Sequence, residues 1–230
     1  MRPSRPISFA ILIASLCLSL TNCKQENGSK AVVVSDPRGA VVSEDAVSRA
    51  ELTAVLASRD FDQSIVLINR VKRMRYQGEV LPLLMQVWQL DLSAIPQVDK
   101  AFAAHPRIRL EVADVLIQAS RNGKVGLQTD AYSGYARQHV SSKDRDVARQ
   151  AILVLGVAND AADVELLINV LAEENGATFG AAANSFVRNC AVDDARVAQI
   201  ASHIKNQERG EYLRSSWKDM QALRSHICRR

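Results

Sequence analysis

The sequence predicts an all-α fold, and three observations carry that prediction. Apolar residues recur every three or four positions through most of the chain after residue 43, which is the period of an amphipathic helix. Residue types that begin or end helices, such as Asp60 and the pair Asn122-Gly123, separate these stretches. No series of alternating apolar and polar residues indicates a set of strands in that region. Helices joined by short turns therefore account for residues 43–230.

The first half of this region is expected to form five helices. Ser43 and Asp60 are each placed to cap the helix that follows, because their side chains can accept hydrogen bonds from the first turn. Pro82 and Pro106 fall where a first helical turn tolerates proline. The first two helices follow Ser43 and Asp60, and Gly78 breaks the chain after them. The next two cover 80–90 and about 98–104, and the fifth begins at Pro106 and stops at Asn122-Gly123.

The second half is expected to begin with a weakly helical segment and to continue with five clearer helices. Gly126 and Gly134 interrupt the apolar stripe of the first segment. Ser142 is the expected cap of the helix after it, and Gly156 is expected to turn the chain at the end of that helix. The weak segment covers 124–140, residues 142–175 are expected to form two helices separated by turns at Gly156 and Asn159-Asp160, and the last three helices cover about 177–190, 193–205 and 211–227.

Three segments resemble HEAT or armadillo-type repeats. Residues 146–167 combine an apolar-Arg-Ala helix, a Leu-Gly exit, an acidic turn and a second Leu-rich helix, and residues 110–116 and 180–186 are similar to its first helix. The resemblance implies a HEAT-like α-solenoid of about four to five helix pairs, with an irregular helical bundle as the alternative. Small residues at equivalent positions would let neighbouring helices approach closely, and the second helices would line the ligand-binding side. These residues are Ala113, Ala151 and Ala182.

The N-terminal residues 1–22 have the pattern of a secretory signal peptide. Arg2 and Arg5 precede the uncharged apolar run 7–20, and the chain turns polar after Cys23. The run is shorter than the about 20 residues that a membrane-spanning helix needs. A cleaved signal on a soluble protein and an uncleaved span remain the alternatives.

The segment Leu20-Thr21-Asn22-Cys23 resembles the lipobox of bacterial lipoproteins. The resemblance implies cleavage between Asn22 and Cys23, diacylglycerol on the Cys23 sulfur and a fatty acid such as palmitate on its amine. More than one acyl chain gives stable membrane attachment. Lys24, in place of the aspartate of inner-membrane lipoproteins, favours the outer membrane, with the body facing the periplasm. Residues 23–42 would be the tether and 43–230 the repeat domain.

Charge and cysteine content narrow the class of protein further. The formal net charge is only +4, and no long basic block exists, so nucleic acid is not an expected partner. An exported chain meets an oxidising compartment, which makes a disulfide between Cys190 and Cys228 plausible. It would close a loop of about 37 residues and stabilise the fold by roughly 3–4 kcal/mol. The alternative is two free thiols.

One basic cluster and one aromatic residue are candidates for contact with a partner. Arg70, Lys72, Arg73 and Arg75 lie at the end of an expected helix, where they either complement the helix dipole or bind an acidic partner or an anionic lipid. Trp88 is either a core residue or an interface anchor.

No catalytic or metal-binding motif accompanies these features, so we expect no enzyme activity, no metal and no cofactor. The histidines have no metal-ligand spacing, and no nucleophile elbow or phosphate-binding loop occurs. The histidines are His105, His139, His203 and His226. The leading hypothesis is a non-enzymatic envelope lipoprotein that binds another envelope protein as an adaptor, assembly factor or inhibitor. The alternatives are a lyase-type HEAT-repeat enzyme and a cell-wall-bound structural spacer.

Overall fold

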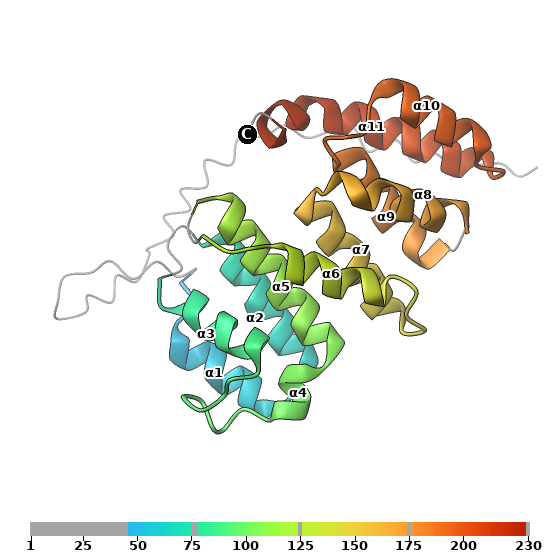
Figure 1. The fold of residues 1–230 in the computed structure, drawn as a ribbon. Helices are drawn as coiled ribbons and strands as arrows, with labels where there is room; N and C mark the ends of the chain where they lie inside the picture. Colours follow the sequence, from blue (N-terminus) through green and yellow to red (C-terminus); the bar gives the residue numbers. More distant parts are fainter. Residues whose placement is uncertain (1–45, 75–77, 124–125, 174–175, 229–230) are drawn as a thin grey trace, which may run out of the picture. The chain divides into compact units, whose positions relative to one another are not determined.

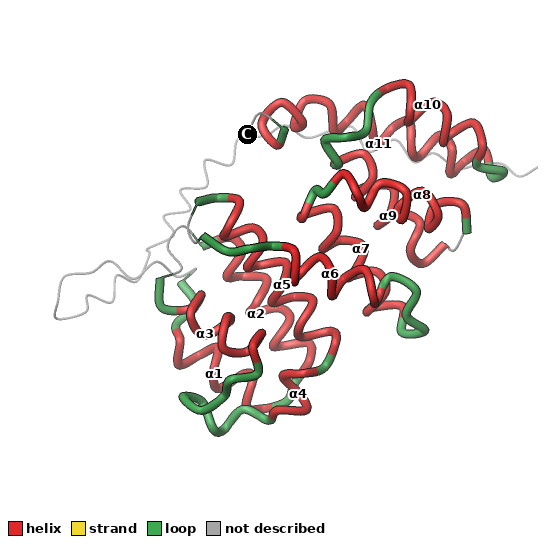
Figure 2. Tube along the Cα trace, viewed as in Figure 1, coloured by secondary structure: helices red, strands yellow, loops and turns green. Residues whose placement is uncertain are grey.

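The computed structural model describes residues 46–74, 78–123, 126–173 and 176–228 (Figure 1). The signal segment, Cys23, the tether and Arg75 lie outside this range. Within it the chain forms helices and no strand (Figure 2), so the all-α prediction is confirmed. The helices are α1 (Arg49–Ser58), α2 (Phe61–Arg73), α3 (Val80–Gln89), α4 (Lys100–Ala104), α5 (Pro106–Arg121), α6 (Asp130–His139), α7 (Arg145–Ala158), the 3-10 helix η1 (Ala161–Asp163), α8 (Val164–Ala172), α9 (Gly176–Arg188), α10 (Asp194–His203) and α11 (Gln207–Ile227).

Local sequence signals set most of the helix boundaries. Asp60 caps α2, because its Oδ1 accepts a 3.0 Å hydrogen bond from the main-chain N–H of Gln63. Pro106 is the first residue of α5, and the helix ends before Asn122. The predicted cap of α7 was wrong by two residues: Asp144 accepts the hydrogen bonds of the first turn, while the Ser142 hydroxyl accepts one from the N–H of Asp144.

Five helices pack in one row, in the order α2, α5, α7, α9 and α11, and each contacts the next. We call these the row helices. Other helices pack on the row, with α3 on α5, α6 on α7, α8 on α9 and α10 on α11 (Figure 1). The pairing differs from the one expected for residues 146–167, because α8 packs mainly on α9 and not on α7. Antiparallel neighbours are thus α6 with α7, α8 with α9, and α10 with α11.

The small residues singled out in the row helices are buried. Ala113, Ala151 and Ala182 come from α5, α7 and α9, and all three are fully buried. Gly156 lies inside α7 and does not turn the chain, which corrects the sequence expectation. The helix ends two residues later, before Asn159, whose φ is 57°. A Cβ atom on Gly156 would lie 2.5 Å from the Ser185 Oγ and 2.9 Å from the Ser185 Cα. The close approach of α7 and α9 at this point therefore requires glycine at position 156.

Gly156→Ala is therefore expected to lower the free energy of unfolding by about 1–3 kcal/mol, because the added methyl group forces α7 and α9 apart. Gly134→Ala is the matched control, since a Cβ there meets nothing within 4 Å. It should raise the helix stability by about 0.5–1 kcal/mol. Urea unfolding followed by circular dichroism measures both variants. Equal effects of the two substitutions would contradict the close crossing.

Candidate functional site

A stripe of polar side chains runs along one face of α5. Its members follow the spacing i, i+4, i+7, i+11 and i+14, so the helix places them in one line. They are Arg107, Glu111, Asp114, Gln118 and Arg121, which we call the polar stripe. The stripe lies between neighbours in the row, because its side chains contact Lys72 of α2 and Gln150 of α7. Glu111 and Asp114 retain only 9% and 8% side-chain exposure, unlike residues of a solvated helix face.

One lysine serves two carboxylates at the centre of the stripe. The Nζ of Lys72 donates to the Asp114 Oδ2 at 2.6 Å and to the Glu111 Oε2 at 3.2 Å. Gln118 also donates from its Nε2 to the Asp114 Oδ1 at 2.6 Å. Shielded ion pairs of this kind contribute less to stability than to the choice of one arrangement over others, because desolvation offsets much of the attraction.

The surroundings of Glu111 raise its pKa. Burial raises the pKa of Glu111, and the Lys72 ammonium lowers it by less; the nearby Asp114 carboxylate raises it as well. Because Glu111 and Asp114 share the single Lys72 ammonium group, the centre of the polar stripe has more carboxylates than cations.

A cavity of about 160 Å³ opens beside this centre. Charged side chains of both signs line it, together with one apolar residue. The lining residues are Ile65, Arg107, Glu111, Asp146, Arg149 and Gln150. The Arg107 Nη2 lies 3.6 Å from the Asp146 Oδ2 and 3.7 Å from the Asp62 Oδ1, which are loose ion pairs. This cavity offers hydrogen-bond donors and acceptors to a polar ligand. A ligand carboxylate can also replace Asp146 or Asp62 as the partner of Arg107.

Lys72 does not belong to the basic contact surface that the sequence predicts at the end of α2. Lys72 is drawn into the polar stripe, because two shielded carboxylates hold its ammonium group, and it does not project into solvent. The Arg70 guanidinium lies 3.4 Å from the Glu51 carboxylate of α1, with both side chains half exposed. Arg73 is exposed at the end of α2.

Trp88 holds three helices together. Its ring contacts the ring of Tyr132 at a centroid distance of 4.7 Å and that of Tyr135 at 5.4 Å. The Arg109 guanidinium lies 4.3 Å from the Trp88 ring centre and 4.4 Å from that of Tyr135, so it contacts both rings. Cation–π contacts of this kind join α3, α5 and α6.

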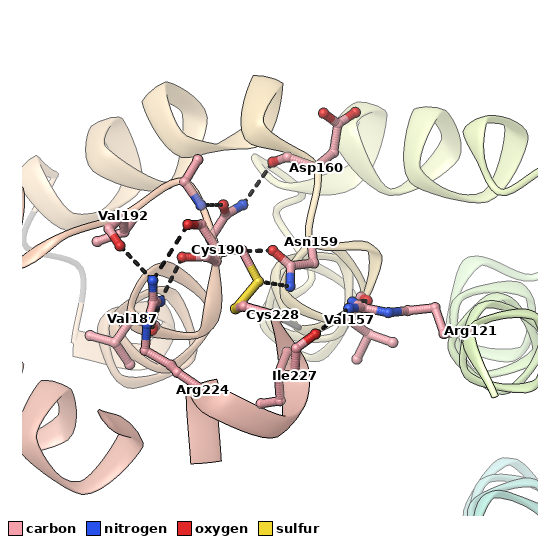
Figure 3. Close-up of a disulfide and its surroundings, with 12 residues drawn as sticks. Arg121, Val157, Asn159, Asp160, Val187, Cys190, Val192, Arg224, Ile227 and Cys228 are labelled. Carbon is pink, nitrogen blue, oxygen red and sulfur yellow. Dashed lines mark hydrogen bonds between the residues drawn. A yellow bond between two sulfur atoms is a disulfide. The ribbon is translucent and has the colours of Figure 1, made fainter. Parts of the chain in front are cut away.

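A disulfide joins Cys190 to Cys228, whose Cα atoms lie 5.6 Å apart (Figure 3). The Arg224 guanidinium lies beside it and stacks over the Trp217 ring at 4.5 Å. It donates to the main-chain carbonyls of Val187 at 2.8 Å, Asn189 at 2.7 Å and Val192 at 2.6 Å. Covalent and polar contacts thus fix the end of α11 to the end of α9.

The histidines do not gather into a reactive group. His139 packs on the ring of Tyr135, and burial together with the Arg109 charge lowers its pKa. The His203 ring lies at the exposed end of α10, with its Nδ1 2.7 Å from the Gln199 carbonyl oxygen. Among the described residues no group of three or more His, Cys, Asp and Glu side chains is placed to hold a metal ion. No helix in the same range is both long and apolar enough to cross a membrane.

The polar stripe could have been noticed in the sequence, where its residues recur at helical spacing. The heptad-like spacing of the polar residues on α5 is visible without a structure, but polar residues at that spacing usually mark a solvated face. Only the packing of α2 and α7 on both sides removes these side chains from water. In comparisons with known proteins, no family model, no curated protein and no solved structure matches the chain.

Proposed function

We propose that this chain is a lipid-anchored protein of a bacterial cell envelope that binds another protein through the polar stripe and catalyses no reaction. The observation that carries the binding proposal is the Lys72–Glu111–Asp114 network beside the cavity on α5. Charged groups that are shielded yet reachable determine which partner fits, since a mismatched partner leaves a charge unpaired.

The mixture of charges favours a polypeptide as the ligand. The cavity is bordered by the loosely paired Arg107 and by Arg149, which is exposed on α7. A partner segment with an acidic side chain can take the place of Asp146 or Asp62 at Arg107 without leaving a buried charge. The polar rim found in protein interfaces has the same chemistry.

Two features support the envelope location. The segment that ends at Cys23 resembles a lipobox, and the Cys190–Cys228 disulfide suits a compartment that keeps cysteines oxidised. Acyl chains on Cys23 would keep the helical body beside a membrane, where its partner would also reside.

The anchor and the binding surface can be tested in one experiment on intact cells. Cells express the full chain with a photo-crosslinking amino acid at Arg149, or at Ser202 of α10 as a control that is also exposed. We expect an adduct of one defined mass at position 149 and none at position 202. The same cells carry an alkyne-labelled fatty acid, and we expect the label on the wild-type chain and on Cys17→Ser, but not on Cys23→Ser.

Each half of this experiment can fail separately. Label on Cys23→Ser, or a Cys23→Ser chain of the same mass as the wild type, would exclude lipid attachment at this residue. Identical adducts at positions 149 and 202, or none at either, would exclude the polar stripe as the binding surface while leaving the anchor intact.

A further inference from the structure

A second cavity of about 160 Å³ lies at the far end of the polar stripe, where four row helices end. Its walls come from the C-terminal turns of α5, α7, α9 and α11. The lining residues are Gln118, Arg121, Asn122, Val157, Arg188, His226 and Ile227. Three of them have basic side chains, and none of these lining residues is acidic.

Basic residues are expected at helix C-terminal ends, because the last carbonyl groups carry partial negative charge. Two arginines fill that role here (Figure 3). Arg121 donates from its Nη1 to the Val157 carbonyl at 2.6 Å and from its Nη2 to the Ile227 carbonyl at 3.5 Å. Arg224 serves the carbonyls at the end of α9. Arg121 and Arg224 thus pair with carbonyl groups at the ends of α7, α9 and α11, and Arg188 is not needed for this.

Arg188, the last residue of α9, differs from these two. Its Nε is buried and has no hydrogen-bond acceptor in the part of the chain that the structure describes. No carboxylate in the same part lies within ion-pair distance of its guanidinium. The half-buried Arg188 side chain thus lines the cavity without an anionic partner among the described residues, and an anion bound in the cavity would supply one.

We propose that this cavity binds a phosphate-type oxoanion, with Arg188 as its direct ligand, with Arg121 adding positive charge and with His226 adding a hydrogen-bond donor. The planar guanidinium group presents parallel N–H donors that match two oxygens of a phosphate. The cavity has room for one phosphate group and is too small for a nucleotide. The group can belong to free phosphate or to the headgroup of an anionic lipid. Its binding does not depend on the protein partner proposed above.

Calorimetric titration of the detergent-solubilised full chain separates the two sources. One arm uses inorganic phosphate against potassium chloride of equal ionic strength, and the other uses dihexanoyl phosphatidic acid below its micelle concentration. We expect saturable binding of at least one probe. Binding of both probes would identify the phosphate group itself as sufficient, and binding of the lipid alone would identify a headgroup site.

The variants decide whether the cavity is responsible. Arg188→Gln is expected to weaken binding about tenfold or more, because the charged direct ligand is lost. Arg73→Gln removes the same charge from the last residue of another helix, and its affinity should equal that of the wild type. If Arg188→Gln does not fold, Arg188→Lys decides, since it keeps the charge but loses the planar fork and should also bind more weakly. Absence of saturable binding of both probes, equal weakening by the Arg188 and Arg73 variants, or unchanged affinity in Arg188→Lys would overturn the proposal.

Discussion

Lys72→Met is expected to lower the free energy of unfolding by about 3–5 kcal/mol at neutral pH, because it leaves two shielded carboxylates without a cation. Glu111 and Asp114 both lose their ion-pair partner, and their side chains are only 9% and 8% exposed. Methionine keeps the length of the lysine stem, so the loss reports the charge and not a cavity. Urea unfolding of the full chain at pH 7, followed by circular dichroism, measures the difference.

Arg70→Met is the matched control for this substitution. Arg70 lies on the same helix, and its guanidinium is 3.4 Å from the Glu51 carboxylate, but the two side chains are 38% and 42% exposed. An exposed pair of this kind contributes less than about 1 kcal/mol. Similar losses in the two variants would mean that Lys72 is solvated in solution.

The pH dependence of the network has a definite sign. Because burial raises the pKa of Glu111, the folded chain binds this proton more tightly than the unfolded chain does. Its contribution therefore makes the free energy of unfolding fall as the pH rises from the ordinary glutamate pKa, about 4.3, through the raised pKa. Glu111→Gln should remove this slope and be at least as stable as the wild type at pH 7. A Glu111→Gln chain that is less stable than the wild type at pH 7 and equally stable at pH 4 would reverse the sign.

Loss of the disulfide is the second large effect that we expect. Cys228→Ser should lower the free energy of unfolding by roughly 3–4 kcal/mol, because the unfolded chain regains the freedom of the loop between the two cysteines. Cys190→Ser should have the same effect, and the double variant should lose no more than either single variant. Urea unfolding with and without a reducing agent provides the measurement, and the reductant should weaken the wild type alone.

The surroundings of the disulfide allow a stricter test of its location. The Asn159 side chain accepts a 2.7 Å hydrogen bond from the Cys190 N–H, and the Arg224 guanidinium binds carbonyls on both sides of Cys190. These contacts should keep the end of α11 on α9 after the sulfur atoms are separated. We therefore expect Cys228→Ser to retain the helical circular dichroism signal of the wild type below the unfolding transition. A wild-type chain that unfolds identically with and without reductant would show that the two thiols are not joined.

Local signals in the sequence predicted the helices well, because a helix boundary depends on neighbours within one turn. Asp60 caps α2 and Pro106 begins α5 as expected, since capping and the fixed φ of proline act between adjacent residues. The helical period of the apolar residues likewise predicted which class of fold forms. Where a competing cap lies close by, as at Ser142 and Asp144, the local signal was ambiguous by two residues.

The role of single residues depended on helices that are distant in the sequence. Gly156 has the sequence context of a turn, yet Ser185 of α9 gives it the role of a contact point inside α7. Lys72 belongs to a run of basic residues at a helix end, yet Glu111 and Asp114 of α5 remove it from that run. No pattern around either residue contains this information, because the partners are about 30 to 40 positions away and the packing of the row decides which residues meet.

By itself, the amino-acid sequence determined the all-α class, the number of helical segments to within one or two, and the residues that begin and end several of them. The tertiary structure alone decided that α8 packs on α9, that a polar face of α5 is shielded, and that the Arg188 Nε is buried at a junction of helix ends. The physical reason is the range of the forces involved. Backbone propensity and capping act within a turn, whereas burial and ion pairing act between surfaces that come together only when the chain folds.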